Sequence, residues 1–151
     1  MIQRIQSIYL IGSIIVLILI LVFPIAIMID AQSESYTYLF YGVLNSQGLL
    51  AMQAYPLAIL LIAMPLISLV SIFLFKKRIL QMRFCIYNII LMLGSIGLIW
   101  FYSYQAGNTL FTETIFSFPI VLPLVAAILT YLAFRGIRRD EILIKSVDRI
   151  R

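Results

Sequence analysis

The chain has 151 residues, of which 64% are hydrophobic and 11% are charged, and its formal net charge is +5. Soluble domains average ~45 to 50% apolar and ~25% charged residues, so this composition excludes an ordinary water-soluble domain, whose surface would carry large apolar patches. The sequence has no histidine and one cysteine, Cys85, which excludes histidine-dependent triads, zinc sites and an internal disulfide. We therefore expect an integral membrane protein that is not an enzyme and has no catalytic, cofactor or metal site.

Four apolar stretches predict four transmembrane helices, because about 20 apolar residues cross the hydrocarbon core as a helix. The first stretch follows Arg4 and contains no acidic or basic side chain. It is longer than the apolar core of a cleavable signal peptide, roughly 7 to 15 residues, so we expect it to be retained. The predicted spans are residues 5–29, 54–75, 84–105 and 115–134, followed by a tail of residues 135–151. The predicted fold is an all-α membrane protein, a single domain over residues 1–151 built as a four-helix bundle.

The connection between the first two spans is long enough to carry structure of its own. Residues 36–44 are rich in β-branched, aromatic and apolar side chains, and Asn45 to Gly48 form a turn signal behind them. These features predict a short strand, which can pair with residues 111–115 of the second outer loop. Loops often carry recognition, but a cap that only seals the bundle is the simpler interpretation.

The basic residues predict the orientation of the chain, since Lys and Arg near span ends stay on the cytoplasmic side. Asp30, Glu34 and Glu113 lie in the first and third connections, which have no basic residue. Both termini and the second connection are therefore expected in the cytoplasm. The eleven basic residues are Arg4, Lys76, Lys77, Arg78, Arg83, Arg135, Arg138, Arg139, Lys145, Arg149 and Arg151.

The tail predicts an amphipathic helix that continues or restarts beyond the membrane. Its apolar stripe comprises Ile137, Leu143, Ile144, Val147 and Ile150. A basic amphipathic helix suits the anionic headgroups of the inner leaflet, and docking to a protein is the alternative. We expect no nucleic-acid binding, because no basic run is continuous.

The two ends of the chain also resemble a known family. Residues 1–10 read MIQRIQSIYL and residues 137–151 read IRRDEILIKSVDRIR. Both blocks are similar to those of a small tetraspan membrane family of the Bacteroidota, domain of unknown function 4293. The resemblance implies a tetraspan helical protein of the bacterial inner membrane, and it implies no activity, substrate or catalytic residue.

Both terminal blocks fall on the same predicted face, which suggests one cytoplasmic interaction surface. We expect Gln3, Arg4 and Gln6 to contact the C-terminal segment, with Arg4 paired to Asp140, Glu141 or Asp148. Separate anchoring of each end to lipid headgroups is the alternative. The candidate surface comprises Gln3, Arg4, Gln6, Arg138, Arg139, Asp140, Glu141, Lys145, Asp148 and Arg149.

These features favour a non-catalytic accessory or adaptor subunit that organises protein partners in the membrane. The expected partners are the lipid bilayer and a membrane protein or a second copy of the chain. Ion and proton pathways usually contain ionisable residues inside spans, whereas the predicted spans contain no acid or base. A small transporter or channel component formed by oligomerisation is therefore the alternative.

Overall fold

The computed structural model describes residues 2–30, 34–110 and 112–148, except for the side chains of residues 2–5, 76, 112 and 144–148. This part of the chain is mostly helical, with a small antiparallel sheet. In chain order the elements are α1 (Ile2–Val22), β1 (Ala26–Asp30), β2 (Ser35–Leu39), β3 (Gly42–Leu44), β4 (Leu50–Gln53), α2 (Tyr55–Phe73), η1 (Leu74–Lys76), α3 (Arg78–Leu110), β5 (Thr112–Phe116), η2 (Phe118–Val121) and α4 (Leu122–Asp148).

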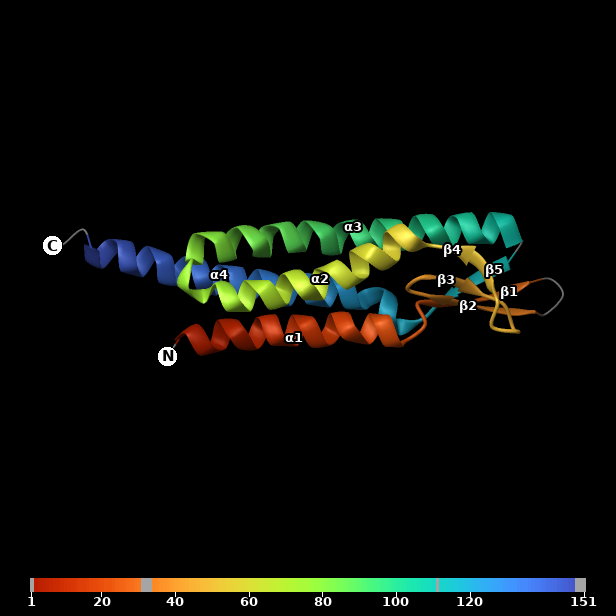
Figure 1. Cartoon of the computed structure of the whole chain (residues 1–151), viewed down its shortest axis with the longest axis horizontal. Coiled ribbons are helices and arrows are strands. Elements are labelled where there is room, and N and C mark those ends of the chain that lie inside the picture. Colours follow the sequence, from red (N-terminus) through yellow and green to blue (C-terminus); the bar gives the residue numbers. More distant parts are fainter. Residues whose placement is uncertain (1, 31–33, 111, 149–151) are drawn as a thin grey trace.

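The helices form an elongated bundle in which α1 and α3 each pack against both α2 and α4. The start of α1, the α2–α3 connection and the end of α4 gather at one end, which we call the basic end, and the sheet lies at the other (Figure 1). The predicted cytoplasmic segments are thus brought together at one end of the molecule. The basic residues with described side chains at this end are Lys77, Arg78, Arg83, Arg135, Arg138 and Arg139.

The length and composition of the helices suit a bilayer. Within the described residues, three segments are long and apolar enough to cross a membrane: Tyr55–Phe73, Arg78–Leu110 and Phe118–Leu143. In α1 the described side chains form a shorter apolar helix, Gln6–Val22. At 1.5 Å per residue, α3 is about 50 Å long, well beyond a hydrocarbon core of about 30 Å. The excess extends alongside the sheet (Figure 1).

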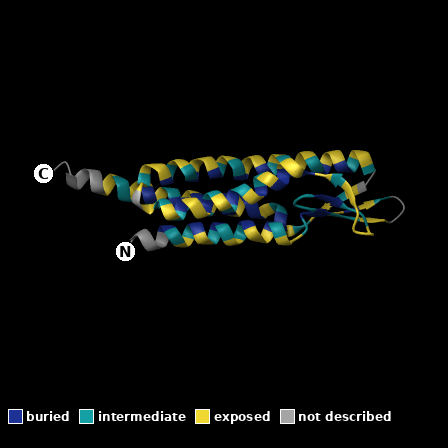
Figure 2. Ribbon diagram, viewed as in Figure 1, coloured by how far each residue is buried: buried dark blue, intermediate teal, exposed yellow. Residues whose placement is uncertain are grey.

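The bundle buries polar side chains and exposes apolar ones. Among the described residues, the buried polar side chains all lie in helices: Gln6, Ser13, Ser68, Ser71, Gln81, Asn88, Ser95, Ser103 and Thr130. Large apolar side chains such as Ile59, Ile90 and Ile128 are more than half exposed on the outside of the bundle, and exposed positions recur along every helix (Figure 2). The core is still mainly apolar, so the difference from a water-soluble bundle lies in the outer surface, which is apolar here and polar in a soluble protein.

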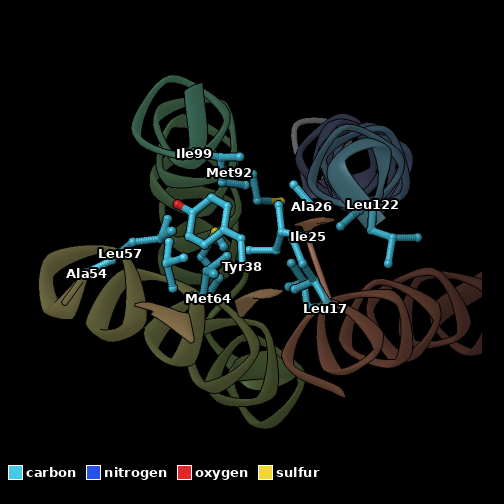
Figure 3. Close-up of a cluster of buried hydrophobic side chains, with 14 of the residues drawn as sticks. Leu17, Ile25, Ala26, Tyr38, Ala54, Leu57, Met64, Met92, Ile99 and Leu122 are labelled. Carbon is cyan, nitrogen blue, oxygen red and sulfur yellow. The ribbon is translucent and has the colours of Figure 1, made fainter. Parts of the chain in front are cut away.

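The sheet closes the far end of the bundle. Its strand order is β4-β3-β2-β1-β5, and every neighbouring pair is antiparallel. Ala26, Met28, Tyr38 and Val43 point toward the helices and are fully buried. Figure 3 shows the ring of Tyr38 inserted among side chains of α2 and α3, close to Leu57 and Ile99. The inner face of the sheet therefore belongs to the same core as the helices.

The first predicted span, residues 5–29, is wrong at its outer end. The helix ends at Val22, and residues 26–30 form β1. Pro24 explains the end, because a proline disfavours helical geometry in the residue before it and has no backbone N–H to donate. The N–H of Ile25 instead donates to the carbonyl oxygen of Tyr38, at 2.8 Å. Residues 23–29 are nearly all apolar, and an apolar run does not by itself separate helix from buried strand.

The predicted strand pairing needs two further corrections. Residues 36–44 form two strands, β2 and β3, which pair with each other across a turn at residues 40–41. β5 pairs with β1 and not with residues 36–44. Residues 115–116 therefore belong to a strand, and α4 begins at Leu122 after a short 3₁₀ turn. The turn predicted at Asn45 is confirmed, since the Asn45 side chain accepts hydrogen bonds from the N–H groups of Gln47 and Leu49.

The C-terminal helix continues the fourth helix without a break. α4 runs from Leu122 to Asp148, a length of about 40 Å. It passes beyond the α2–α3 connection at the basic end (Figure 1). This protruding part carries most of the predicted interaction surface.

Candidate functional site

A hydrogen bond joins the two terminal helices at the basic end. Nε2 of Gln6 in α1 donates to Oδ2 of Asp140 in α4 at a distance of 2.6 Å. Gln6 is 7% exposed, so its amide is largely removed from water and the bond to a carboxylate is of the stronger, charge-assisted kind. The contact predicted between Gln6 and the C-terminal segment is present.

Gly136 makes room for this contact. A Cβ atom placed on Gly136 would lie 3.0 Å from Cγ of Gln6, so any larger residue would push the Gln6 side chain away from α4. Gly136 and Asp140 are four residues apart and therefore share one face of the helix. The Gln6 side chain thus lies across Gly136 and reaches its acceptor one turn later.

The remaining predicted residues divide into two groups. Arg138 and Arg139 are exposed on α4, and Glu141 is half-buried. The side chains of Gln3, Arg4, Lys145 and Asp148, and the whole of Arg149, lie outside the described residues. The predicted ion pair of Arg4 with Asp140, Glu141 or Asp148 therefore stays a prediction.

Gln6 also lines a pocket of about 480 Å³ between α1 and the α2–α3 connection. Its polar lining consists of Gln6, Ser7, Arg78 and Gln81. Its apolar lining consists of Ile8, Ile11, Ile72 and Phe75. The pocket therefore combines a polar part with an apolar part at the basic end of the bundle.

Arg78 is the cation of this pocket. It begins α3, and its Nη1 atom is buried without a hydrogen-bond partner among the described residues. An unpartnered buried donor on a charged group is costly, so a guanidinium in this position favours an anionic or acceptor group beside it. In the sequence, Arg78 is recognisable only as one of the basic residues that predict the topology. Its combination with Gln6 and Gln81 depends on the packing of α1 against the α2–α3 hairpin.

The polar groups in the middle of the bundle connect helices. Nδ2 of Asn88 in α3 donates to Oγ of Ser68 at 2.7 Å and to the carbonyl oxygen of Met64 at 3.2 Å, both in α2. The hydroxyls of Ser13 in α1 and Thr130 in α4 lie 3.0 Å apart. Such bonds are a common means of helix association in membranes. They give these buried residues a structural role that needs no transported ligand.

The described residues include no cluster of side chains suited to binding a metal ion. No group of three or more His, Cys, Asp or Glu side chains is placed there to hold a metal ion. Cys85, the lone cysteine, is buried and packs in a small cluster with Leu10, Ala133 and Ile137.

The fold and its polarity define a small helical bundle with an apolar exterior, closed at one end by an antiparallel sheet. The chain belongs to the family described as domain of unknown function (DUF4293), which matches residues 2–150. The match extends through both terminal blocks and the sheet, so the family covers the whole fold. No curated protein matches the chain.

Proposed function

We propose that the protein is a non-catalytic, multi-pass protein of the bacterial inner membrane and serves as an accessory or adaptor subunit. In this proposal α1, α2, α3 and α4 each cross the bilayer, both termini are cytoplasmic and the sheet lies on the outer side. The observation that carries the proposal is the polarity of the bundle, with Ser13, Asn88 and Thr130 buried and large apolar side chains outside. Lipid is the solvent in which such a surface is stable.

The distribution of charge supports the proposed orientation. Lys77, Arg78 and the arginines of α4 gather at the basic end, whereas Asp30 and Glu113 lie in the strands at the sheet end. Basic residues flanking membrane spans are retained in the cytoplasm. The length of α3 also agrees, because its excess beyond the hydrocarbon core lies beside the sheet and contributes to that outer part.

The adaptor role is supported by the end of α4. Arg135, Arg138, Arg139 and Ile142 are exposed on a helix that projects beyond the α2–α3 connection. The Gln6–Asp140 bond attaches the start of α1 to this part of α4. A rigid, basic and partly apolar helix of this kind can bind an acidic groove of a partner.

Cysteine labelling in intact cells tests the topology. In a Cys85→Ser background, single cysteines replace Gln47 in the turn between β3 and β4 and Arg138 in α4, both exposed. A membrane-impermeant maleimide should label the Gln47→Cys variant in cells with a permeabilised outer membrane, and the Arg138→Cys variant only after the inner membrane is opened. Labelling of the Arg138→Cys variant in closed cells would contradict the proposed orientation.

Site-specific crosslinking tests the adaptor role. A photoreactive side chain at Arg139 should crosslink one protein in near-stoichiometric yield, because this position lies on the proposed docking surface. The same side chain at Ile128, exposed on the lipid-facing part of α4, is the matched control and should give lipid adducts. Equal crosslinking at both positions would contradict the adaptor role. Ion flux from the purified protein in liposomes would favour a transporter or channel instead.

A further inference from the structure

We propose that the pocket at the basic end binds one anionic phospholipid of the inner leaflet, with the headgroup phosphate at Arg78 and one acyl chain along the apolar wall. The inference rests on the proposed function, because it needs the basic end at the depth of the inner headgroups. It goes further by assigning a ligand class to a site that adaptor activity does not require.

The apolar wall of the pocket has the chemistry of an acyl-chain site. Ile8 and Ile11 come from α1, and Ile72 and Phe75 come from the end of α2 and the turn that follows it. Ile8, Ile11 and Phe75 are 64%, 47% and 53% exposed, so the wall is open to the surrounding solvent. The whole pocket has a volume of about 480 Å³, which falls within the range of roughly 300 to 1,000 Å³ that small-molecule sites occupy.

The polar wall has the chemistry of a phosphate site. Arg78 lines the pocket and is half-buried. Its Nη1 atom is enclosed by protein atoms and has no hydrogen-bond partner in the described part of the chain, so a phosphate in the pocket reaches this atom only after the guanidinium turns toward it. A planar guanidinium binds phosphate through paired N–H donors. Gln6 and Gln81 are 7% and 5% exposed and border the same space, so their amides can donate to phosphate or glycerol-ester oxygens.

The position of the two walls favours a lipid over a soluble anion. A free phosphate would pair with Arg78 and leave the apolar wall uncovered, and an apolar chain alone would leave Nη1 of Arg78 without a hydrogen-bond partner. A phospholipid supplies both groups in one molecule, and an anionic headgroup, unlike phosphatidylcholine, brings no cation next to Arg78 and Lys77. Binding between α1 and the α2–α3 connection would also stabilise the helix whose Gln6 holds α4, which links the lipid to the docking surface.

Native mass spectrometry of the purified full chain tests the proposal. The protein is released from nanodiscs containing equal amounts of dioleoyl phosphatidylglycerol and dioleoyl phosphatidylcholine. The wild type should retain one phosphatidylglycerol in preference to phosphatidylcholine. Arg78→Gln should reduce that retention about ten-fold, as expected for loss of one charge-assisted phosphate contact.

Lys77→Gln is the matched control for charge. It removes the same charge from the preceding residue, whose exposed side chain does not line the pocket, and retention should change by less than about two-fold. Ile11→Trp should block the acyl-chain wall, whereas Ile15→Trp, one helical turn further along α1 and outside the pocket, should not. Both variants change exposed positions, so the comparison does not depend on a buried substitution.

Four outcomes in a chain that is membrane-inserted would overturn the proposal. If Arg78→Gln and Lys77→Gln lowered the retention of phosphatidylglycerol equally, the preference for this lipid would come from general surface charge and not from the pocket. Thermal stabilisation by inorganic phosphate as large as that by phosphatidylglycerol would indicate a soluble-anion site. A second copy of the chain, found in place of lipid in the native spectra, would make the pocket part of a dimer interface. Correct membrane topology without lipid retention would reject only this inference, whereas a water-soluble chain would reject the proposed function as well.

Discussion

Gln6 and Asp140 are 134 residues apart in the sequence and are joined by a hydrogen bond of 2.6 Å. The bond connects the first helix of the chain to the protruding end of the last helix. Gly136 allows the approach, because its missing side chain leaves space for the stem of Gln6. This arrangement makes the direction of α4 dependent on α1, so the two terminal segments act as one structural unit.

Gln6→Ala should destabilise the protein by about 1 to 3 kcal/mol, because it leaves the Asp140 carboxylate without this donor in a partly buried position. The free energy of unfolding can be measured by denaturant titration in mixed micelles. Gln105→Ala, an exposed glutamine on α3, is the control and should stay within about 0.5 kcal/mol of the wild type. The double variant Gln6→Ala/Asp140→Ala should lose less free energy of unfolding than the two single variants lose together. Strict additivity would show that the bond contributes nothing.

Tyr38 should make the sheet less stable as the pH rises into the alkaline range. Burial raises the pKa of Tyr38 above the ordinary tyrosine value of about 10, and the neighbouring Tyr102 adds to the increase. The unfolded chain therefore loses this proton at a lower pH than the folded chain. The stabilising contribution is complete below about pH 10 and is lost as the pH rises through the pKa of the folded state.

Thermal unfolding of the wild type and Tyr38→Phe as a function of pH tests this expectation. Above about pH 10 the melting temperature of the wild type should fall more steeply than that of the variant, which has no phenol at this position. At neutral pH the variant should be as stable as the wild type or more stable by about 1 kcal/mol, since the buried Tyr38 hydroxyl has no hydrogen-bond partner in the described part of the structure. Parallel curves over the alkaline range would contradict the role of Tyr38.

Asn88 should be the polar residue on which the α2–α3 contact depends most. Asn88→Ala removes the donors to Ser68 and Met64 and should lower the free energy of unfolding by about 0.6 to 2 kcal/mol, the range for polar contacts between membrane helices. Asn108→Ala, at an exposed position of the same helix, is the matched control and should have little effect. Equal effects of the two changes would show that the interhelical bonds contribute nothing. Ion-flux measurements on both variants would also separate a structural role of Asn88 from a transport role.

The sequence was sufficient for the helices because long apolar runs separated by charges have few alternative structures. The spans predicted from Ala54 to Phe75 and from Phe84 to Gln105 coincide with α2 and with the central part of α3. The grouping of the N-terminal segment, the second connection and the tail at one end followed from the alternation of the predicted spans, and the start of α1, the α2–α3 connection and the end of α4 lie together at one end of the structure (Figure 1).

The sheet was only partly predictable, because strand pairing is a long-range property. Residues 26–29 are apolar on both faces, with Met28 buried and Ile27 and Ile29 exposed, so the alternation that identifies a half-buried strand is missing. Pro24 was the available signal that the helix ends early. The pairing of β1 with both β2 and β5 depends on contacts between residues far apart, such as Ile27 with Ile115, and no local pattern encodes it.

The Gln6–Asp140 contact and the pocket also differ in how far the sequence predicts them. A contact between Gln6 and the C-terminal segment could be predicted from sequence, because both belong to terminal blocks on one predicted face, but Asp140 was expected as a partner of Arg4 and not of Gln6. The pocket could not be predicted from the sequence, because Ile8, Ile72 and Arg78 come from separate helical segments and line one space only after the helices pack.

Gly42 should be the glycine on which the sheet depends. It pairs with Gln53 of β4, and a Cβ atom at this position would collide with the carbonyl oxygen of Met52. Because that oxygen belongs to the backbone of the neighbouring strand, it cannot move without separating β3 from β4. Gly42→Ala should therefore destabilise the sheet by about 2 kcal/mol or more, and limited proteolysis should cleave residues 40–53 faster than in the wild type.

Gly97→Ala provides the opposite expectation within the same protein. The added methyl group would meet no atom within 4 Å, and alanine favours a helix interior over glycine by about 0.5 to 1 kcal/mol. This variant should be slightly more stable than the wild type and should show unchanged cleavage of the sheet. If Gly42→Ala resisted proteolysis as well as Gly97→Ala does, then β3 and β4 would not be held as closely as the structure places them. The inner face of the sheet would then protect the core around Tyr38 poorly from solvent.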